Sequence, residues 1–282
     1  MIDQSQLDAM RPWLHDFDLP APLRVPMDAS LRARIVQRRN LIVPRIVAQF
    51  PGGRLDGLRV LDLGANAGFW ARQMAALGAN VTAIEPKRHN VAQAEAVAQV
   101  LGDAGIIWIE DTAEAFLSES TQRFDVVLNL GLLYHAEDAY GLLRLSAGAC
   151  SDLLVVDSHC INDDAAYIEY RLEYTELPSQ GTSPVVTVPS RGGIYQMMRA
   201  TGFDQLMESA NSGDVPADYA SFTRVCMFAR RHGRLMQASP ADMLEDQLKR
   251  VYPSLPAQGD LNRSAPAPRT NLRRDVEGAA KT

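Results

Sequence analysis

The feature that most constrains this chain is a glycine-containing turn between an apolar run and a helix-like run. Residues 58–63 are mostly apolar, and Phe69–Leu77 follows with the spacing of a helix. Between them lie Asp62, Gly64 and Gly68, in the pattern D-x-G-x-x-x-G. Because glycine has no Cβ atom, the backbone N–H groups of such a turn can approach a bound ligand closely. The pattern therefore predicts a buried strand, a ligand-binding turn and a helix.

Two other interpretations of this turn have to be weighed. Dinucleotide-binding proteins use the pattern G-x-G-x-x-G, with the helix N-terminus facing a pyrophosphate. Asn66 stands where that pattern needs its second glycine, so a pyrophosphate-binding turn is not predicted. The same residues could also form an ordinary strand, turn and helix, in which the glycines serve only the turn.

Acidic residues end the next two predicted strands. Residues 80–84 form a short apolar segment followed by Glu85. An acid about 20 residues after the glycine turn is placed to accept hydrogen bonds from both hydroxyls of a ribose. A third strand, beginning at 105, leads to Asp111 and Thr112. Glu85 could instead be a surface carboxylate, and Asp111 could cap the following helix.

A fourth apolar segment, residues 124–130, leads into the sequence Gly-Leu-Leu-Tyr-His at 131–135. Together with the glycine turn and the two acidic strand ends, it resembles the class I S-adenosylmethionine (SAM) methyltransferases. The 131–135 loop, with Trp13 and residues 17–20, is similar to one subgroup of that family. That subgroup contains the tRNA wobble-uridine carboxymethyl-transferase and many small-molecule methyltransferases. The resemblance extends over roughly residues 11–230.

The resemblance implies a Rossmann-like α/β fold and SAM as the cofactor. Its sheet would have seven strands, mostly parallel, with the last strand antiparallel. The turn would surround the methionine end of SAM, Glu85 would bind the ribose, and Asp111 with Thr112 would receive the adenine. The residues predicted to bind the cofactor are Asp62, Gly64, Ala65, Asn66, Gly68, Glu85, Asp111, Thr112, Asn129 and Leu130.

Two histidines are candidates for a general base. Methyl transfer from a sulfonium is an in-line displacement, so the protein mainly positions the reactants. A base helps where the attacking group must lose a proton, and histidine titrates near neutrality. His135, after the fourth strand, is the first candidate, and His159, after the fifth, is the second. His135 could instead only fix its loop, whereas Asp157 could orient His159 and make it more basic.

A metal site is the alternative use of the residues around the fifth strand. Asp157, His159, Asp163 and Asp164 carry side chains that bind metals. Their spacing matches no metal-binding motif, and acids in loops are usually solvated. The sequence therefore predicts no bound metal.

The chain divides into three predicted parts. Residues 1–57 form an N-terminal helical cap, in which Pro44 should kink or divide a helix. Residues 58–232 form the methyltransferase domain, because alternating strands and helices imply parallel strands with right-handed crossovers. Its insertion at 158–190 should contribute to the acceptor pocket, since ligands bind at this edge of a parallel sheet. Residues 233–282 should form a short helix around Ala241–Val251, followed by a disordered tail from Pro256.

Net charge and cysteine usage indicate which classes of partner and which cellular compartment the chain suits. The net charge is −6, which argues against a nucleic-acid substrate. Local arginines could form either a solvated helix face or a site for a phosphate or carboxylate: Arg32, Arg34, Arg38, Arg39 and Arg45. The three cysteines form no C-x-x-C pair, which suits the reducing cytoplasm. We find no signal-peptide pattern and no apolar run long enough to cross a membrane.

These observations predict a cytoplasmic enzyme that transfers a methyl group from SAM to oxygen or nitrogen of a small-molecule acceptor. Two alternatives remain open: a tRNA-modifying transferase of the wobble-uridine type, and a SAM-binding protein without catalysis. The tRNA-acting members of the subgroup carry a longer N-terminal region than residues 1–57, which argues against tRNA and against carboxylated SAM. A nucleotide-dependent dehydrogenase is the weakest alternative, and the oligomeric state is not predicted.

Overall fold

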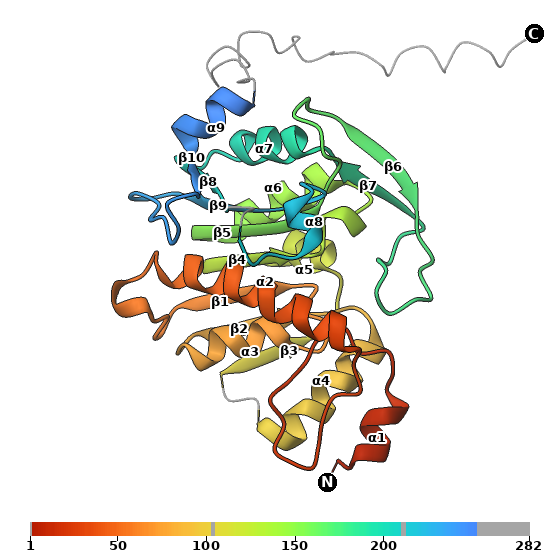
Figure 1. Ribbon diagram of the computed structural model, residues 1–282. Helices are drawn as coiled ribbons and strands as arrows, with labels where there is room; N and C mark the ends of the chain where they lie inside the picture. The colour runs from red at the N-terminus through yellow and green to blue at the C-terminus, as the bar shows by residue number, and fades with distance from the viewer. Residues whose placement is uncertain (1, 103–104, 210–212, 253–282) are drawn as a thin grey trace, which may run out of the picture.

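The computed structural model describes residues 2–102, 105–209 and 213–252. Its centre is an eight-stranded sheet with the order β10-β8-β9-β5-β4-β1-β2-β3 (Figure 1). Five strands run parallel: β1 (Arg59–Leu63), β2 (Asn80–Ile84), β3 (Ile106–Ile109), β4 (Phe124–Leu130) and β5 (Cys150–His159). Three more pair antiparallel to their neighbours: β8 (Gln205–Glu208), β9 (Arg224–Arg230) and β10 (Met243–Leu244).

The Rossmann-like arrangement agrees with the prediction, but the prediction of seven strands is wrong. The additional strand is β10, which has two residues and pairs with the edge of β8. Met243 and Leu244 lie where the sequence pattern predicts the start of a helix, and the helix α9 begins only at Glu245. The pairing depends on the free edge of β8, which is a tertiary contact that no local pattern reports.

Helices cover both faces of the sheet (Figure 1). Alternate residues of β4 point to opposite faces, so Val126 and Leu128 join one hydrophobic core and Val127 joins the other. Because both faces are covered, the central strands are almost wholly apolar. The helices of the first core are α2 (Ala29–Val47), α3 (Phe69–Ala76) and α4 (Arg88–Leu101). Those of the second are α5 (Ala113–Glu119), α6 (Ala139–Ala149) and α7 (Arg191–Ala200).

The N-terminal segment packs its long helix α2 across the sheet, after the short helix α1 (Gln4–Ala9) (Figure 1). The prediction of two separate helices at Pro44 is wrong, because α2 continues through it to Val47. The kink, its alternative, stays a prediction. Proline removes one helical hydrogen bond, the one to the carbonyl of Asn40. Asn40 and Pro44 are both exposed, so water can bind that carbonyl, and Pro44 lies in the last turn of the helix.

The insertion at 158–190 contains a separate hairpin of β6 (Ile168–Leu172) and β7 (Val185–Pro189). The short elements that remain are η1 (Pro51–Gly53), η2 (Leu133–His135), α8 (Ala217–Ala220) and α9 (Glu245–Val251). Among the described residues, no helix is both long and apolar enough to cross a bilayer. The tail predicted to be disordered from Pro256 lies outside the described residues.

Candidate functional site

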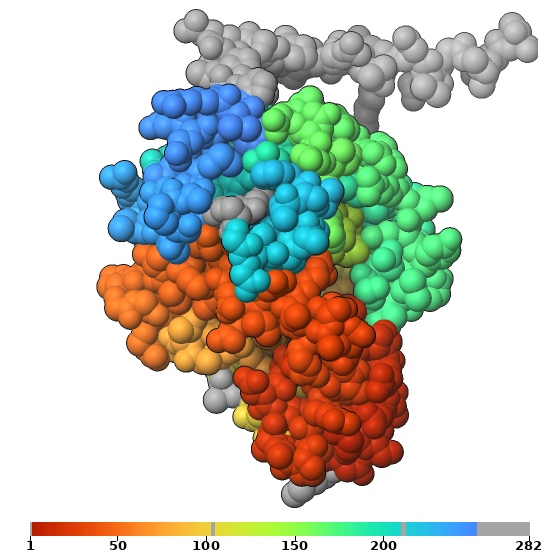
Figure 2. Space-filling model, viewed as in Figure 1, coloured from red at the N-terminus to blue at the C-terminus, as the bar shows by residue number. Residues whose placement is uncertain are grey.

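A pocket of about 240 Å³ lies at the carboxyl ends of the parallel strands. The strand order reverses between β1 and β4, and open α/β sheets bind ligands at this kind of position. The loops after β1, β2, β3 and β4 each line the pocket, through residues that include Gly64, Glu85, Thr112 and Gly131. The N-terminal segment (red and orange) and the insertion (green) complete its wall and lie next to one another on the surface (Figure 2).

The turn after β1 has the backbone shape that its glycines predict. Gly64, Asn66 and Gly68 have φ angles of +66°, +52° and +86°. Gly64 and Asn66 line the pocket, whereas Gly68 does not. A Cβ atom at Gly68 would lie 2.6 Å from the ring of Trp108, so only glycine fits there. Gly68 therefore serves the packing of the turn against β3.

Asp62 and Ala65, two predicted cofactor ligands, lie behind the pocket wall. Ala65 is 1% exposed and donates its N–H to the carbonyl of Ile84 at 2.9 Å. Asp62 is also 1% exposed, and its carboxylate accepts the N–H of Ala71 while Oδ2 has no partner among the described residues. Burial, together with the charge of Glu85, raises the pKa of Asp62 to about 7.

The raised pKa of Asp62 predicts a loss of stability as the pH rises from about 4 to about 7. In this window the folded chain keeps a proton that the unfolded chain releases, so ionisation favours unfolding. Between pH 5 and pH 8, the free energy of unfolding in urea should fall by about 2 kcal/mol more in the wild type than in Asp62→Asn. Asp56→Asn, at an exposed carboxylate, should show no such difference. Equal pH dependence in Asp62→Asn and the wild type would contradict this assignment.

Glu85 lines the pocket and keeps one hydrogen-bonding position free. Its Oε1 accepts the N–H of Lys87 at 2.9 Å and the amide of Asn90 at 3.0 Å. Among the residues that the structure describes, its Oε2 accepts only the N–H of Asn66, at 2.8 Å. A carboxylate oxygen has two lone pairs, so Oε2 can accept one further hydrogen bond. Burial raises the pKa of Glu85, and these hydrogen bonds offset part of that rise.

The loop after β3 presents Thr112 rather than Asp111 to the pocket. Thr112, Ala113 and Glu114 line it, whereas Oδ1 of Asp111 accepts the N–H of Thr112 at 2.7 Å. Thr112 is also the N-cap of α5, and its Oγ1 accepts the N–H of Ala115 at 3.1 Å. The interpretation of Asp111 as the helix cap is therefore wrong. The residue after it has the hydroxyl at the capping position.

The two predicted cofactor ligands at the end of β4 lie in different surroundings. Leu130 lines the pocket. Asn129 is fully buried, and neither atom of its amide bonds to another described residue. A buried amide without a protein partner is costly, so an ordered water or a bound molecule is the expected partner of Asn129.

His135 lies in η2, lines the pocket and is held by a carboxylate. Its Nδ1 is 2.5 Å from Oε1 of Glu173, which follows β6, and Oε2 of Glu173 accepts the N–H of Gly181 at 2.7 Å. Burial by itself would raise the pKa of Glu173. The hydrogen bonds from His135 and Gly181 and the charge of Lys87 hold that pKa below its ordinary value. Glu173 therefore stays ionised and orients the imidazole ring.

Sequence reasoning missed Glu173, because 38 residues separate it from His135 and only the hairpin brings the two together. The insertion also reaches the loop after β2. The Lys87 ammonium donates to the carbonyls of Thr175 at 2.8 Å and Leu177 at 2.7 Å. Residues 178–182 then line the pocket beside His135.

The N-terminal segment contributes His15, which sequence reasoning also missed. Its ring stacks on Phe69 with centroids 5.3 Å apart, and its Nδ1 is 3.4 Å from Oδ1 of Asn66. Burial, followed by the charge of Arg38, lowers the pKa of His15 to about 3, so the ring is neutral near pH 7. A single histidine far upstream of the glycine turn gives no local signal of this contact.

His159 lies outside this pocket and does not pair with Asp157. Its Nδ1 is 3.2 Å from the carbonyl oxygen of Thr223, and its Nε2 is 3.9 Å from Asp218. Burial, followed by the charge of Arg224, lowers the pKa of His159 to about 4. It borders a second cavity, beneath the β6–β7 hairpin.

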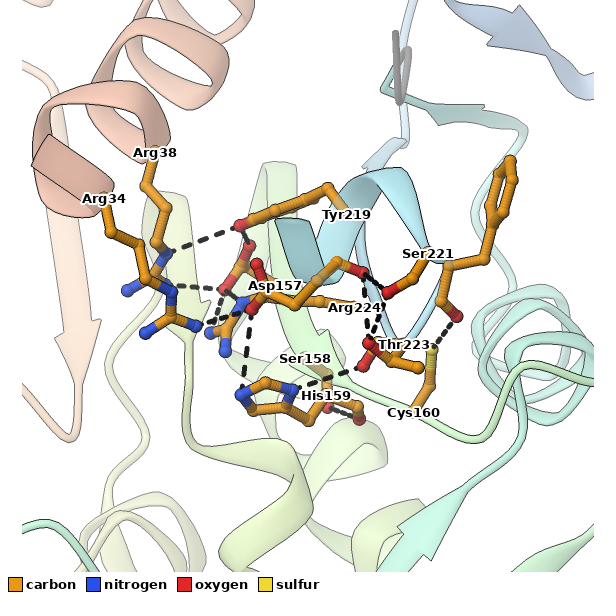
Figure 3. A network of polar contacts seen from close by, with 12 residues as sticks. Arg34, Arg38, Asp157, Ser158, His159, Cys160, Tyr219, Ser221, Thr223 and Arg224 are labelled. Atoms are coloured by element: carbon orange, nitrogen blue, oxygen red, sulfur yellow. Dashed lines mark hydrogen bonds and ion pairs between the residues drawn. The ribbon is translucent and has the colours of Figure 1, made fainter. Parts of the chain in front are cut away.

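Asp157 instead binds two arginines and a tyrosine, all 5% exposed or less. Its Oδ1 accepts from Nη2 of Arg38 at 2.6 Å and from Nε of Arg224 at 2.8 Å, and its Oδ2 accepts from the Tyr219 hydroxyl. Figure 3 shows Arg38 reaching from α2 to this carboxylate, with Arg224 beside it. Burial opposes the charge on Asp157, yet the charges of Arg224 and Arg38 hold its pKa well below the ordinary value.

Two arginines of the predicted basic cluster are therefore internal. The interpretation as a solvated helix face is wrong for Arg38 and Arg45, which are 5% and 6% exposed. Four of the five arginines pair with acids: Arg32 with Asp16, Arg34 with Asp218, Arg38 with Asp157 and Arg45 with Asp242. In the described part of the chain, no three His, Cys, Asp or Glu side chains gather where they could hold a metal ion.

Known proteins share this sequence pattern and fold. The family described as "Methyltransferase domain" matches residues 33–211. The ubiquinone biosynthesis O-methyltransferase of Methylocella silvestris is 42% identical over 90 residues, which are 32% of this chain and 34% of that protein. The enzyme of the same name from Rhizobium rhizogenes is 30% identical over 147 residues, which are 52% of this chain and 58% of that protein. The chain thus spans between about a third and three fifths of the length of these curated relatives.

Among solved structures, the N-terminal domain of EvdMO1, determined in the presence of SAH and D-fucose, has a similar fold. Its TM-score is 0.60 at 21% identity, covering 81% of this chain and 95% of that chain. Because the family match spans more than half of the sequence, this chain belongs to the methyltransferase domain family.

Proposed function

We propose that this chain transfers a methyl group from SAM to a small-molecule acceptor. The observation that carries the proposal is that one pocket is lined by the β1 turn, Glu85, Thr112 and His135. The membership of the methyltransferase family and the printed activity of the curated relatives support it. Those relatives are O-methyltransferases, which favours oxygen over nitrogen as the atom modified.

The residues of the pocket fit SAM. Gly64 and Asn66 would border the methionine part, and the free position on Oε2 of Glu85 would accept a ribose hydroxyl. The backbone around Thr112 would receive the adenine. The unpartnered amide of Asn129 is a further polar group at the end of β4. When bound, SAM supplies a methyl group on a positively charged sulfur.

We propose that His135 is the base that takes the proton from the acceptor. A hydroxyl acceptor must lose its proton as the new bond forms, so a neutral imidazole in the pocket can act as the base. Because Glu173 accepts the Nδ1 hydrogen, the lone pair of the ring lies on Nε2. His159, the second candidate, is less suited, because it lies outside this pocket.

Replacing His135 with alanine should lower kcat by about 100-fold or more and leave SAM affinity nearly unchanged. Turnover of labelled SAM and titration calorimetry measure the two quantities separately. His159→Ala is the matched control and should keep most of the activity. Unchanged turnover in His135→Ala would remove this residue as the base.

Three measurements test the proposal as a whole. Titration calorimetry should detect binding of SAM and of its demethylated product, and absence of heat for both would refute a SAM site. Mass spectrometry of the purified protein should identify co-purified ligand. An acceptor screen with labelled SAM then tests transfer. Binding without turnover on any acceptor would favour the alternative of a SAM-binding protein without catalysis.

The resemblance to the wobble-uridine subgroup leaves a tRNA-modifying transferase, with SAM or carboxylated SAM, as the second candidate. The arginines of α2 favour the small acceptor, because Arg32, Arg34 and Arg45 each pair with an acid of their own. A tRNA complex should lose affinity steeply as salt rises from about 50 to about 200 mM, since phosphate contacts release counterions. Salt-sensitive tRNA binding of this kind would favour the tRNA candidate.

A further inference from the structure

One wall of the pocket carries more positive than negative charge. Arg34, Arg38 and Arg224 all line the pocket. Arg34 pairs with Asp218 at 2.5 Å, whereas Arg38 and Arg224 share the single carboxylate of Asp157. Figure 3 shows these three arginine side chains converging on the same region. Among the described residues, these three guanidinium groups have two carboxylates as ion-pair partners, so one positive charge has no counter-ion of its own.

Other titratable groups packed here do not balance that charge. His15 and His159 are neutral near pH 7, because burial lowers the pKa of each to about 3 and about 4 respectively. Burial also raises the pKa of Tyr219, so its phenol keeps its proton. Glu173 is engaged by His135. Glu85 and Glu114 line the pocket from the loop after β2 and from α5, and neither forms an ion pair with these arginines among the described residues.

The two arginines that share Asp157 have hydrogen-bonding capacity left. In the described part of the chain, Arg38 and Arg224 donate to protein atoms through Nε and Nη2 only, so Nη1 of each is uncommitted. Gly131 keeps the space beside them open. A Cβ atom there would lie 3.2 Å from Nη2 of Arg224 and 3.8 Å from Nη2 of Arg38.

Aromatic rings hold both guanidinium groups in place. Arg38 lies 5.4 Å from the ring centre of Trp70, and Arg224 lies 5.7 Å from that of Tyr134. Positions fixed in this way lower the entropy cost of binding a ligand. The ring centres of Tyr134 and His135 are also 4.0 Å apart. One small molecule can therefore reach the arginines and the proposed base together.

We propose that Arg38 and Arg224 bind an anionic group of the methyl acceptor, either a carboxylate or a phosphate. A guanidinium group matches both anions in shape and charge, and the anion would balance the excess buried cation. The inference rests on the proposed function, because it places the anion on the acceptor. A carboxylate of the cofactor would have the same chemistry, and the experiment below separates the two sources.

The experiment compares benzoate and phenyl phosphate with neutral benzamide. Each is titrated at millimolar concentration against full-length protein saturated with SAH, with thermal unfolding and calorimetry as readouts. The wild type should bind at least one of the two anions and not benzamide. Arg38→Met should bind that anion at least about tenfold more weakly. Arg38→Met leaves Asp157 and Arg224 as a one-to-one pair, so the chain should still fold.

Arg54→Met, which breaks an exposed ion pair with Asp56, is the matched control and should bind like the wild type. Equal binding of the anions and benzamide by the wild type would overturn the inference. So would equal anion binding by the wild type and Arg38→Met. Weaker SAH binding in Arg38→Met would assign the arginines to the cofactor and also overturn it. A wild type that binds no SAH contradicts the proposed function instead, so the two failures are distinguishable.

Discussion

Replacing Asp157 with alanine should lower the free energy of unfolding by about 3–5 kcal/mol, because it leaves buried charges uncompensated. The carboxylate is fully buried and is the shared partner of Arg38 and Arg224. Its removal leaves two buried guanidinium groups side by side. Their repulsion raises the free-energy cost of burying each positive charge. Urea unfolding at pH 7, followed by circular dichroism, measures the change.

Two further variants sharpen this prediction. Arg38→Met should lower the free energy of unfolding less than Asp157→Ala. Both remove the Arg38–Asp157 ion pair, but in Arg38→Met the carboxylate stays paired with Arg224. Asp56→Ala breaks an exposed pair with Arg54 and should change stability little. An equal loss of unfolding free energy in Arg38→Met and Asp157→Ala would contradict the excess of positive charge in this cluster.

The lowered pKa of Asp157 predicts that the folded protein loses stability in acid. The pKa of Asp157 is held well below its ordinary value, so the unfolded chain takes up a proton first as the pH falls. The stabilisation is thus fully present above about pH 4 and is lost as the pH falls further.

Replacing Glu85 with alanine should weaken SAM binding by about 10- to 100-fold, the loss expected for a hydrogen bond to a charged group. The change removes the proposed acceptor for the ribose hydroxyl. It also releases the N–H groups of Asn66 and Lys87, which Glu85 holds in the loops after β1 and β2. Titration calorimetry with SAM measures the affinity.

Glu85→Gln is the matched variant, because its side chain keeps one carbonyl oxygen and nearly the same shape. It should bind SAM with an intermediate affinity. A thermal unfolding midpoint for each variant separates loss of the site from loss of the fold. A normal dissociation constant in a folded Glu85→Ala variant would refute the ribose assignment.

Local sequence patterns predicted the central part of the molecule well. Apolar runs located β1 to β4, because strands buried on both faces need apolar residues throughout. The sequence pattern also located the ends of those strands and predicted that Gly64, Glu85 and Thr112 meet. All three line one pocket. Asp62 and Asp111 show the limit of this reasoning. A position next to the turn did not reveal whether the side chain points into the pocket.

By itself, the sequence determined the Rossmann-like sheet, the turn after β1 and the edge at which the candidate site lies. These follow from local physics: apolar runs form buried strands, and glycines permit the backbone angles of the turn. Only the tertiary structure decided that Glu173 holds His135, that Asp157 pairs with arginines, and that His15 completes the pocket wall. Each of these contacts joins residues far apart in the chain, and charge pairing depends on distance in space rather than on spacing in the sequence.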